Sequence, residues 1–210
     1  MSLRRLLPIL AILALSLINT AARPIELGYK IGDYAADFEL KNIDGSLVKL
    51  GMMKYNSAKG FIIVFTCNHC PFSKKYEDGI IALNKKYEPL GYPLIAINPN
   101  DPELEPEDSF ENMQMRAKEK GFSFPYLFDE SQATTCLFGA KKTPQLFILK
   151  KESGQYKVVY MGAIDSDFQS LKEKREKYSE QAMDELLAGK AVSNPNTSAK
   201  LVGCGIKFKQ

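Results

Sequence analysis

The 210-residue chain lacks tryptophan, contains one histidine and four cysteines, and lacks an apolar run of the length that spans a membrane. Its longest run, Leu6–Ile18, covers 13 residues, whereas a spanning helix needs about 20. The chain also lacks an excess of charge: the formal net charge is +3, and +1 without residues 1–22, whose only charged residues are Arg4 and Arg5. A net charge this small does not indicate the excess of basic residues that is typical of nucleic-acid-binding proteins. The composition, 45% hydrophobic and 25% charged, excludes disordered, collagen-like and multi-span membrane classes.

The first 22 residues have the organisation of a secretory leader. Arg4 and Arg5 precede the apolar run, and small residues follow it at positions 20–22. We expect a signal peptide over residues 1–22, so the mature protein would be exported, periplasmic or extracellular, with no stable membrane span after cleavage. An uncleaved anchor is the weaker alternative because the run is short, and no cysteine follows it for lipid attachment.

Export changes the interpretation of the cysteines, because disulfides persist outside the reducing cytosol. Four cysteines in 188 mature residues are too few for a scaffold that replaces a core. Cys67 and Cys70 are close enough in sequence to form a catalytic pair. Cys136 and Cys204 are isolated, which favours structural or spare thiols, and a bridge between those two remains an alternative.

The middle of the chain has the pattern of an α/β core. Residues 61–65 form a continuous apolar run typical of a central strand buried on both faces. A helix is predicted from Pro71, with Ile80, Leu83, Tyr87 and Leu90 on one face and Gly91 as its stop. A second strand at 94–97 then implies a parallel pair.

The remaining segments extend this core into a mixed sheet flanked by helices. Residues 98–107 are predicted to form a surface loop, and Asp108 or Ser109 to cap a helix that ends at Gly121. Further expected elements are a strand at 124–128, a helix at 131–138, an antiparallel hairpin of strands at 146–149 and 158–160, and a helix within 166–188. Residues 190–210 have the pattern of an extended tail, and no second domain is indicated.

The sequence Cys67-Asn-His-Cys70 places two thiols one helical turn apart at the end of the central strand. Cys67 can attack a disulfide and Cys70 can resolve the mixed intermediate. A helix N-terminus favours an anion, so we expect the pKa of Cys67 to lie in the range of about 3.5 to 7.5 known for such sites. His69 would tune the thiolate, with a solvated loop residue as the alternative.

Two other uses of the pair are weaker. Tetrahedral zinc takes four ligands, and the chain has neither a second pair nor another histidine, so no metal site is expected. An inert structural bridge would close too small a loop to stabilise the protein much.

Several segments together resemble one protein family. They are Phe65-Thr-Cys-Asn-His-Cys-Pro-Phe72, the Thr143-Pro144 pair before an apolar strand, the segment from Gly32 to Leu40 with Asp44-Gly45, Pro106-Glu-Asp-Ser109, Phe124-Pro-Tyr-Leu127, Asp129-Glu-Ser-Gln132 and Gly203-Cys-Gly-Ile-Lys207. The chain is similar over about residues 27–210 to the thioredoxin superfamily, in its peroxiredoxin-like (AhpC/TSA-type redoxin) branch.

The resemblance implies a thioredoxin-like three-layer α/β fold over residues 27–190, with a tail at 191–210. It also implies that Cys67 and Cys70 are the redox pair and that Pro144 is a cis-proline facing them. The backbone of Thr143 would then turn toward an incoming extended chain, with Thr66 at the same substrate face.

This sequence departs from the patterns of both thioredoxin and the peroxiredoxins. Thr66 stands where thioredoxin has tryptophan before the first cysteine, and the buried acid a few residues upstream is missing. The peroxiredoxin pattern Pro-x-x-x-Thr/Ser-x-x-Cys is absent. No arginine lies near the motif, since only Arg23, Arg116 and Arg175 remain after the leader.

The sequence therefore predicts an exported thiol/disulfide oxidoreductase that acts on protein or small-molecule thiols and disulfides. No organic cofactor is expected. One alternative is a thiol-dependent peroxidase that reduces peroxides at Cys67. The other is a copper chaperone, because soft thiolates select Cu(I).

Overall fold

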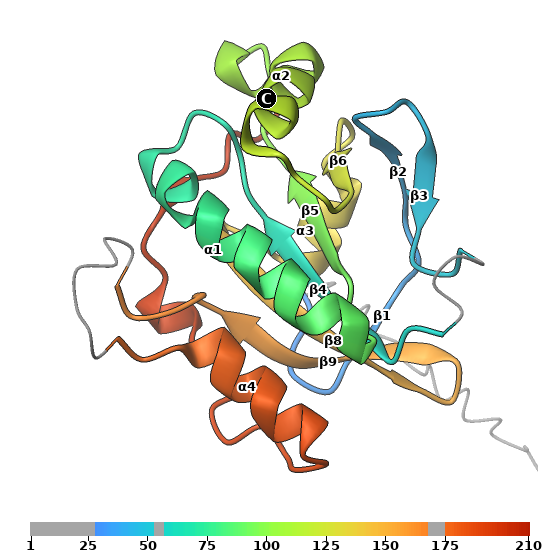
Figure 1. Cartoon of the computed structure of the whole chain (residues 1–210). Helices are drawn as coiled ribbons and strands as arrows, with labels where there is room; N and C mark the ends of the chain where they lie inside the picture. The colour runs from blue at the N-terminus through green and yellow to red at the C-terminus, as the bar shows by residue number, and fades with distance from the viewer. Residues whose placement is uncertain (1–27, 53–56, 168–174) are drawn as a thin grey trace, which may run out of the picture.

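A computed structural model describes residues 28–52, 57–167 and 175–210 (Figure 1). Its centre is an eight-stranded mixed sheet. The order across the sheet is β1 (Tyr34–Ala35), β9 (Gln155–Gly162), β8 (Gln145–Glu152), β4 (Gly60–Phe65), β5 (Leu94–Asn98), β6 (Tyr126–Phe128), β2 (Glu39–Asn42) and β3 (Leu47–Lys49). A second, two-stranded sheet pairs β7 (Lys142–Thr143) with β10 (Cys204–Gly205).

Strand β4 is central, as its apolar run predicted. It lies between β5, which runs parallel to it, and β8, which runs antiparallel. Side chains alternate between the faces of a strand, so Ile62 and Val64 enter one hydrophobic cluster and Phe61, Ile63 and Phe65 enter the other. All six residues of β4 are buried. The predicted antiparallel hairpin is also present, as β8 paired with β9.

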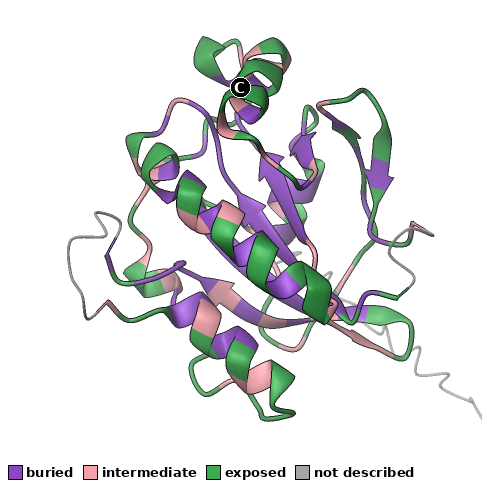
Figure 2. Cartoon of the chain, viewed as in Figure 1, coloured by how far each residue is buried: buried purple, intermediate pink, exposed green. Residues whose placement is uncertain are grey.

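Helices cover both faces of the sheet, and Figure 2 shows the buried strands between them. The helices α1 (Pro71–Tyr87), α2 (Phe110–Lys120) and α4 (Tyr178–Leu187) contribute buried side chains to one cluster. The short helix α3 (Ala133–Phe138) contributes Phe138 to the cluster on the opposite face. The predicted three-layer α/β fold with a central mixed sheet is thus confirmed.

Helix α1 begins as predicted, with Cys70 at its N-cap and Pro71 in its first turn. Its end differs from the prediction, because the chain tightens into a 3₁₀ turn at Glu88–Leu90 before Gly91, which has φ +94°. Leu90 consequently points out of the core and is 42% exposed, so its assignment to the inward face was wrong.

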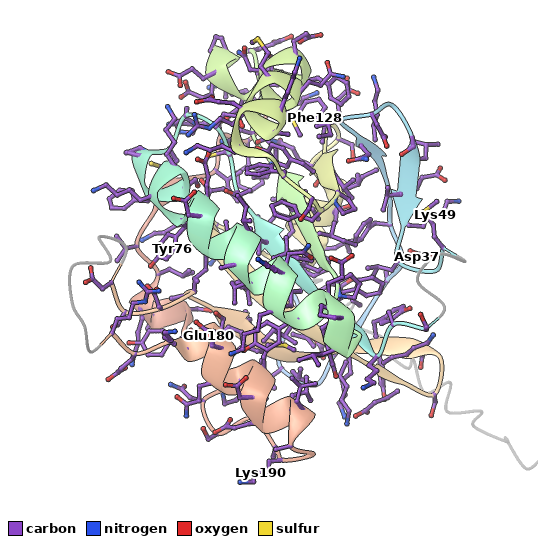
Figure 3. All side chains as sticks on the ribbon, in the orientation of Figure 1. Asp37, Lys49, Tyr76, Phe128, Glu180 and Lys190 are labelled. Atoms are coloured by element: carbon purple, nitrogen blue, oxygen red, sulfur yellow. The ribbon has the colours of Figure 1, made fainter. Side chains whose placement is uncertain are left out.

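Polar contacts fix the other helices in place. Ser109 caps α2 by accepting a hydrogen bond from the backbone N–H of Asn112 (3.3 Å), and Gly121 ends the helix in the left-handed region. Helix α4 packs along α1, where Glu180 pairs with Lys86 at 2.9 Å; Figure 3 labels Glu180 at this contact.

Three further features differ from the sequence expectations or fall outside them. The segment 98–107 is not wholly a surface loop, because Asn98, Asn100 and Asp101 are buried. The tail is not simply extended: it contains a 3₁₀ turn at Ser198–Lys200 and the strand β10. The expected leader lies outside the described residues, within which no helix has both the length and the apolar character to cross a membrane.

Candidate active site

Cys67 and Cys70 lie where the central strand is followed by a helix. Cys67 follows the carboxyl end of β4, and Cys70 caps α1. Both side chains are buried, with 3% of Cys67 and none of Cys70 exposed. Both sulfur atoms lie against the same residue, Thr143. The structure therefore brings together the two thiols that the motif predicted and shields both of them from solvent.

The Thr143-Pro144 segment lies directly against this pair, and its peptide bond is cis. The hydroxyl oxygen of Thr143 lies 3.0 Å from the sulfur of Cys67. Its carbonyl oxygen lies 3.3 Å from the sulfur of Cys70. Thr66 is buried and lines a small cavity behind Cys67, together with Glu77 and Tyr126.

The electrostatics of the pair reverse our expectation for the reduced protein. Burial raises the pKa of Cys67 above its usual value, and the hydrogen bond with Cys70 raises it further. The hydrogen bond from Cys67 lowers the pKa of Cys70 to about 4, assisted by Cys204 and by the backbone N–H of Ser73. The predicted low pKa of Cys67 is thus wrong for this state. Burial thus favours the neutral thiol of Cys67, whereas the donors around Cys70, at the helix N-terminus, favour an anion there.

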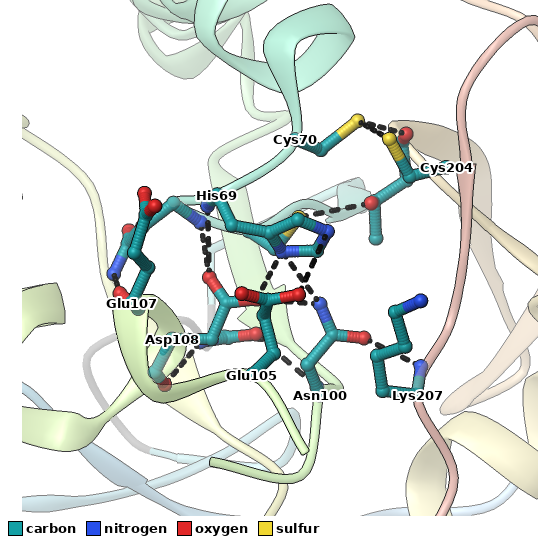
Figure 4. Close-up of polar contacts among 12 residues, drawn as sticks. His69, Cys70, Asn100, Glu105, Glu107, Asp108, Cys204 and Lys207 are labelled. Atoms are coloured by element: carbon teal, nitrogen blue, oxygen red, sulfur yellow. Dashed lines mark hydrogen bonds and ion pairs between the residues drawn. The ribbon is translucent and has the colours of Figure 1, made fainter.

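His69 is not a solvated loop residue, because its ring packs against a buried carboxylate. Nδ1 of His69 lies 2.5 Å from Oδ2 of Asp108 (Figure 4). Asp108 is fully buried and also accepts hydrogen bonds from the backbone N–H groups of Asn68 (2.6 Å) and His69 (3.1 Å) and from the amide of Asn100 (2.6 Å). Nε2 of the ring lies 3.8 Å from Glu105.

Asp108 is a site residue that sequence reasoning missed. We considered it only as a helix cap, whereas its carboxylate lies beneath the CNHC loop, 40 residues away in sequence from Asn68. It supplies the buried acid that the segment upstream of Cys67 lacks. The sequence feature that could have identified Asp108 is its position in the Pro106-Glu-Asp-Ser109 segment, which is one of the segments that resemble the family.

Cys204 is the second residue that the sequence placed wrongly. It is neither isolated nor beside Cys136, because its sulfur lies 2.6 Å from the sulfur of Cys70 (Figure 4). Strand β10 brings it there by pairing Cys204 with Thr143. The edge expected to receive an incoming chain is therefore occupied by the protein's own tail. Cys136 lies on α3 as a free, partly buried thiol.

One group of possible metal ligands occurs among the described residues. A sulfur of Cys67, a ring nitrogen of His69 and a carboxylate oxygen of Asp108 lie within 4.8 Å of one another. Both carboxylate oxygens of Asp108 already accept hydrogen bonds from N–H groups, and a structural zinc site takes four ligands. We therefore interpret His69 and Asp108 as part of a hydrogen-bonded network beside Cys67.

The chain is similar to several known proteins. The chain is 26% identical over 135 residues to the thiol-disulfide oxidoreductase ResA of Halalkalibacterium halodurans, covering 64% of this chain and 70% of that protein. An uncharacterized conserved protein from Geobacillus kaustophilus is 36% identical, with a TM-score of 0.74 over 86% of this chain and 93% of that one. A hypothetical protein from Sinorhizobium meliloti 1021 is 28% identical, with a TM-score of 0.75 over 87% and 96%.

The family assignment follows from the sequence model that matches most of the sheet and the redox motif. Residues 31–160, which run from the segment before β1 into β9 and include both Cys67 and Cys70, match the model of the AhpC/TSA family. The chain therefore belongs to the AhpC/TSA family.

Proposed function

We propose that this oxidoreductase catalyses thiol-disulfide exchange through Cys67 and Cys70. The observation that carries the proposal is that both sulfurs lie against the cis Thr143-Pro144 segment at the end of β4, Cys67 at 3.0 Å from the Thr143 hydroxyl oxygen and Cys70 at 3.3 Å from its carbonyl oxygen. Two adjacent thiols can open an external disulfide and close on each other, which is the chemistry of exchange. The relative named as a thiol-disulfide oxidoreductase supports the same activity.

In the proposed reaction Cys67 is the attacking thiol. Its proton passes to the neighbouring Cys70 thiolate, and the Cys67 thiolate attacks one sulfur of the external disulfide. A mixed disulfide forms, and the first substrate thiolate leaves. Cys70 then loses its proton and attacks the Cys67 sulfur, which releases the second substrate thiol. The net change is one external disulfide reduced and one Cys67–Cys70 disulfide formed, or the reverse.

The pair of His69 and Asp108 lies beside Cys67 and supplies a second acceptor for the proton of that thiol. The ring lies within 4.8 Å of Cys67, and its other contact is the buried Asp108 carboxylate. Since the carboxylate is already held by three N–H donors, its position relative to the ring is fixed. His69 and Asp108 thus act as positioning and proton-transfer residues, while the sulfurs perform the exchange.

Cysteine variants of the mature protein test this proposal with insulin or a model disulfide as the substrate. We expect Cys67→Ser to abolish disulfide reduction, and Cys70→Ser to trap a covalent partner on Cys67 because the resolving thiol is gone. Cys136→Ser is the matched control and should behave as wild type, since its sulfur lies on α3 away from the pair. Equal trapping by Cys67→Ser and Cys70→Ser would reverse the assignment of the two roles.

Peroxide reduction is the weaker activity for this site. Peroxide cleavage needs donors placed to stabilise charge on the leaving oxygen. The two arginines in the described ranges are each paired with a carboxylate: Arg116 with Glu77 at 2.7 Å and Arg175 with Asp165 at 3.2 Å. We expect protein disulfides to be exchanged much faster than hydrogen peroxide is consumed at equal thiol concentration. Rapid peroxide turnover that depends on Cys67 and survives Cys70→Ser with an external thiol would favour the peroxidase.

We also propose that the protein acts after export. The support is the leader pattern of Arg4, Arg5 and the apolar run that follows them. N-terminal sequencing of the protein recovered from outside the cytoplasm should begin near Arg23. An intact Met1 on the exported protein would contradict cleavage.

A further inference from the structure

Three sulfurs, rather than two, meet at this site, and Cys70 is the central one. Its sulfur lies 3.3 Å from the carbonyl oxygen of Thr143, whose hydroxyl oxygen lies 3.0 Å from the sulfur of Cys67, and it lies 2.6 Å from the sulfur of Cys204. A separation of 2.6 Å is well inside van der Waals contact of two sulfur atoms. Cys70 is therefore within reach of two alternative disulfide partners.

The tail is built to hold Cys204 at this position. Strand β10 pairs with β7 so that Cys204 lies opposite Thr143. The residue before it, Gly203, packs against the same peptide, because a Cβ atom there would lie 2.3 Å from the Thr143 carbonyl oxygen. Beyond the cysteine, Ile206 is buried, and the backbone N–H of Lys207 donates to Asn100 (2.9 Å). Because the residues on both sides of Cys204 are held by these contacts, the position of Cys204 beside Cys70 is fixed.

Exposure differs among the three thiols. Cys67 and Cys70 are buried, whereas Cys204 is partly exposed and lies nearest to solvent. A disulfide between Cys67 and Cys70 is sheltered from large external thiols, and one that includes Cys204 is more open to them.

We propose that Cys204 is a third redox cysteine, which exchanges with the Cys67–Cys70 disulfide to form a Cys70–Cys204 disulfide at the protein surface. The inference rests on the proposed function, because the Cys67–Cys70 disulfide is the product of that reaction. Cys67 reacts with the substrate disulfide, and the Cys70–Cys204 disulfide is the form that an external thiol reduces.

The exchange is balanced within the chain. The Cys204 thiolate attacks the Cys70 sulfur, a new Cys70–Cys204 bond forms, and the Cys67–Cys70 bond breaks. Cys67 leaves as the thiolate and takes up the proton that Cys204 lost. No electrons enter or leave, so the protein stays oxidised while Cys67 is returned to its thiol form.

The electrostatic environment of Cys204 favours this order of events. In the reduced protein, burial and the adjacent Cys70 thiolate raise the pKa of Cys204 to about 11, while Lys207 opposes both. Once Cys70 is in a disulfide it carries no negative charge, so it no longer raises the pKa of Cys204. Lys207 still lowers that pKa. Cys204 thus ionises more readily when the Cys67–Cys70 disulfide is present.

Disulfide mapping tests the inference without any substrate protein. The Cys67→Ser variant is oxidised with oxidised glutathione, and its tryptic peptides are analysed by mass spectrometry. We expect the peptide of residues 60–74, which contains Cys70, to be linked to the peptide of residues 201–207, which contains Cys204. Two protein thiols should disappear and two glutathione thiols should be released per chain.

Two variants serve as comparisons in the same experiment. Cys67→Ser with Cys136→Ser should retain the link, because Cys136 takes no part in it. Cys67→Ser with Gly203→Val should form much less of the Cys70–Cys204 disulfide, although it still contains both cysteines. The larger side chain at position 203 forces β10 away from Thr143. Partially oxidised wild-type protein provides a measurement without a substitution at the pair, and it should contain both disulfides.

The outcomes separate this inference from the proposed function. Free Cys70 and Cys204 in oxidised Cys67→Ser, together with only the Cys67–Cys70 disulfide in wild type, would overturn the third-cysteine role while leaving exchange at the pair intact. A Cys70–Cys204 link in a protein that exchanges no external disulfide would support the internal contact and refute the proposed function.

Discussion

Asp108→Asn tests whether the buried carboxylate organises the site. The substitution preserves shape, so Oδ1 can still accept from the backbone N–H groups of Asn68 and His69. It replaces Oδ2 by an NH₂ group, which then faces the amide of Asn100 at 2.6 Å and the His69 ring at 2.5 Å. The amide of Asn100 is left without this acceptor, whereas the His69 ring can move its proton to the other nitrogen and accept instead.

The expected decrease in stability follows from these hydrogen bonds. Hydrogen bonds to charged groups contribute about 1.5 to 3 kcal/mol each, and breaking a buried charged network costs about 3 to 5 kcal/mol. Because the bond from Asn100 is broken and the bond with His69 can adapt, we expect Asp108→Asn to lower the free energy of unfolding of the reduced protein by about 2 to 4 kcal/mol. Because the Asp108 charge contributes to the raised pKa of Cys67, the same variant should lower that pKa.

Urea unfolding of the reduced protein measures the first effect, and the ultraviolet absorbance of the thiolate measures the second. Glu107→Gln is the matched control, because that neighbouring carboxylate is exposed and pairs with Lys74 at the surface (3.2 Å). Its effect should stay within about 0.5 kcal/mol. If Asp108→Asn changed stability as little as Glu107→Gln does, the buried network would not organise the site.

Three further predictions concern the thiols and the core. The pKa of Cys70 is lowered to about 4 in the folded protein, from an unfolded value of about 8.5. Between these values the unfolded chain binds more protons, so the stability of reduced wild type should rise with pH relative to Cys70→Ser, as urea unfolding at several pH values will show. His69→Ala should shift the reduction potential of the pair, measured against glutathione, to a more reducing value, because a group that favours thiolate favours the reduced form. Phe147→Ala removes a fully buried ring from the sheet and should lower the free energy of unfolding by about 3 to 5 kcal/mol, whereas exposed Leu137→Ala should change it by less than about 0.5 kcal/mol.

Each of these predictions has a result that would contradict it. A flat difference in stability between wild type and Cys70→Ser across acidic and neutral pH would show that Cys70 carries no stabilised charge. An unchanged potential in His69→Ala would reduce that residue to a structural role. A decrease below about 1 kcal/mol in Phe147→Ala would mean that the core closes around the missing ring.

The sequence determined the features that depend on neighbouring residues. The apolar run at 61–65 identified the central strand because a strand covered on both faces needs apolar side chains at every position. Pro71 and Gly121 marked a helix start and a helix end through their own backbone preferences. The CNHC spacing gave the redox pair because two cysteines one helical turn apart are within reach of each other whatever surrounds them.

The tertiary structure decided what surrounds that pair. Asp108 reaches Asn68 from 40 residues away, and Cys204 reaches Cys70 from 134 residues away. Such distances depend on how the chain crosses over between parallel strands and where the tail returns, and no local pattern encodes them. The ionisation of Cys67 was predicted wrongly for the same reason. The helix N-terminus is a local feature that favours a thiolate, but burial raises the pKa of Cys67, and that burial arises only when the sheet, helix α1 and the cis-proline loop close around the sulfur.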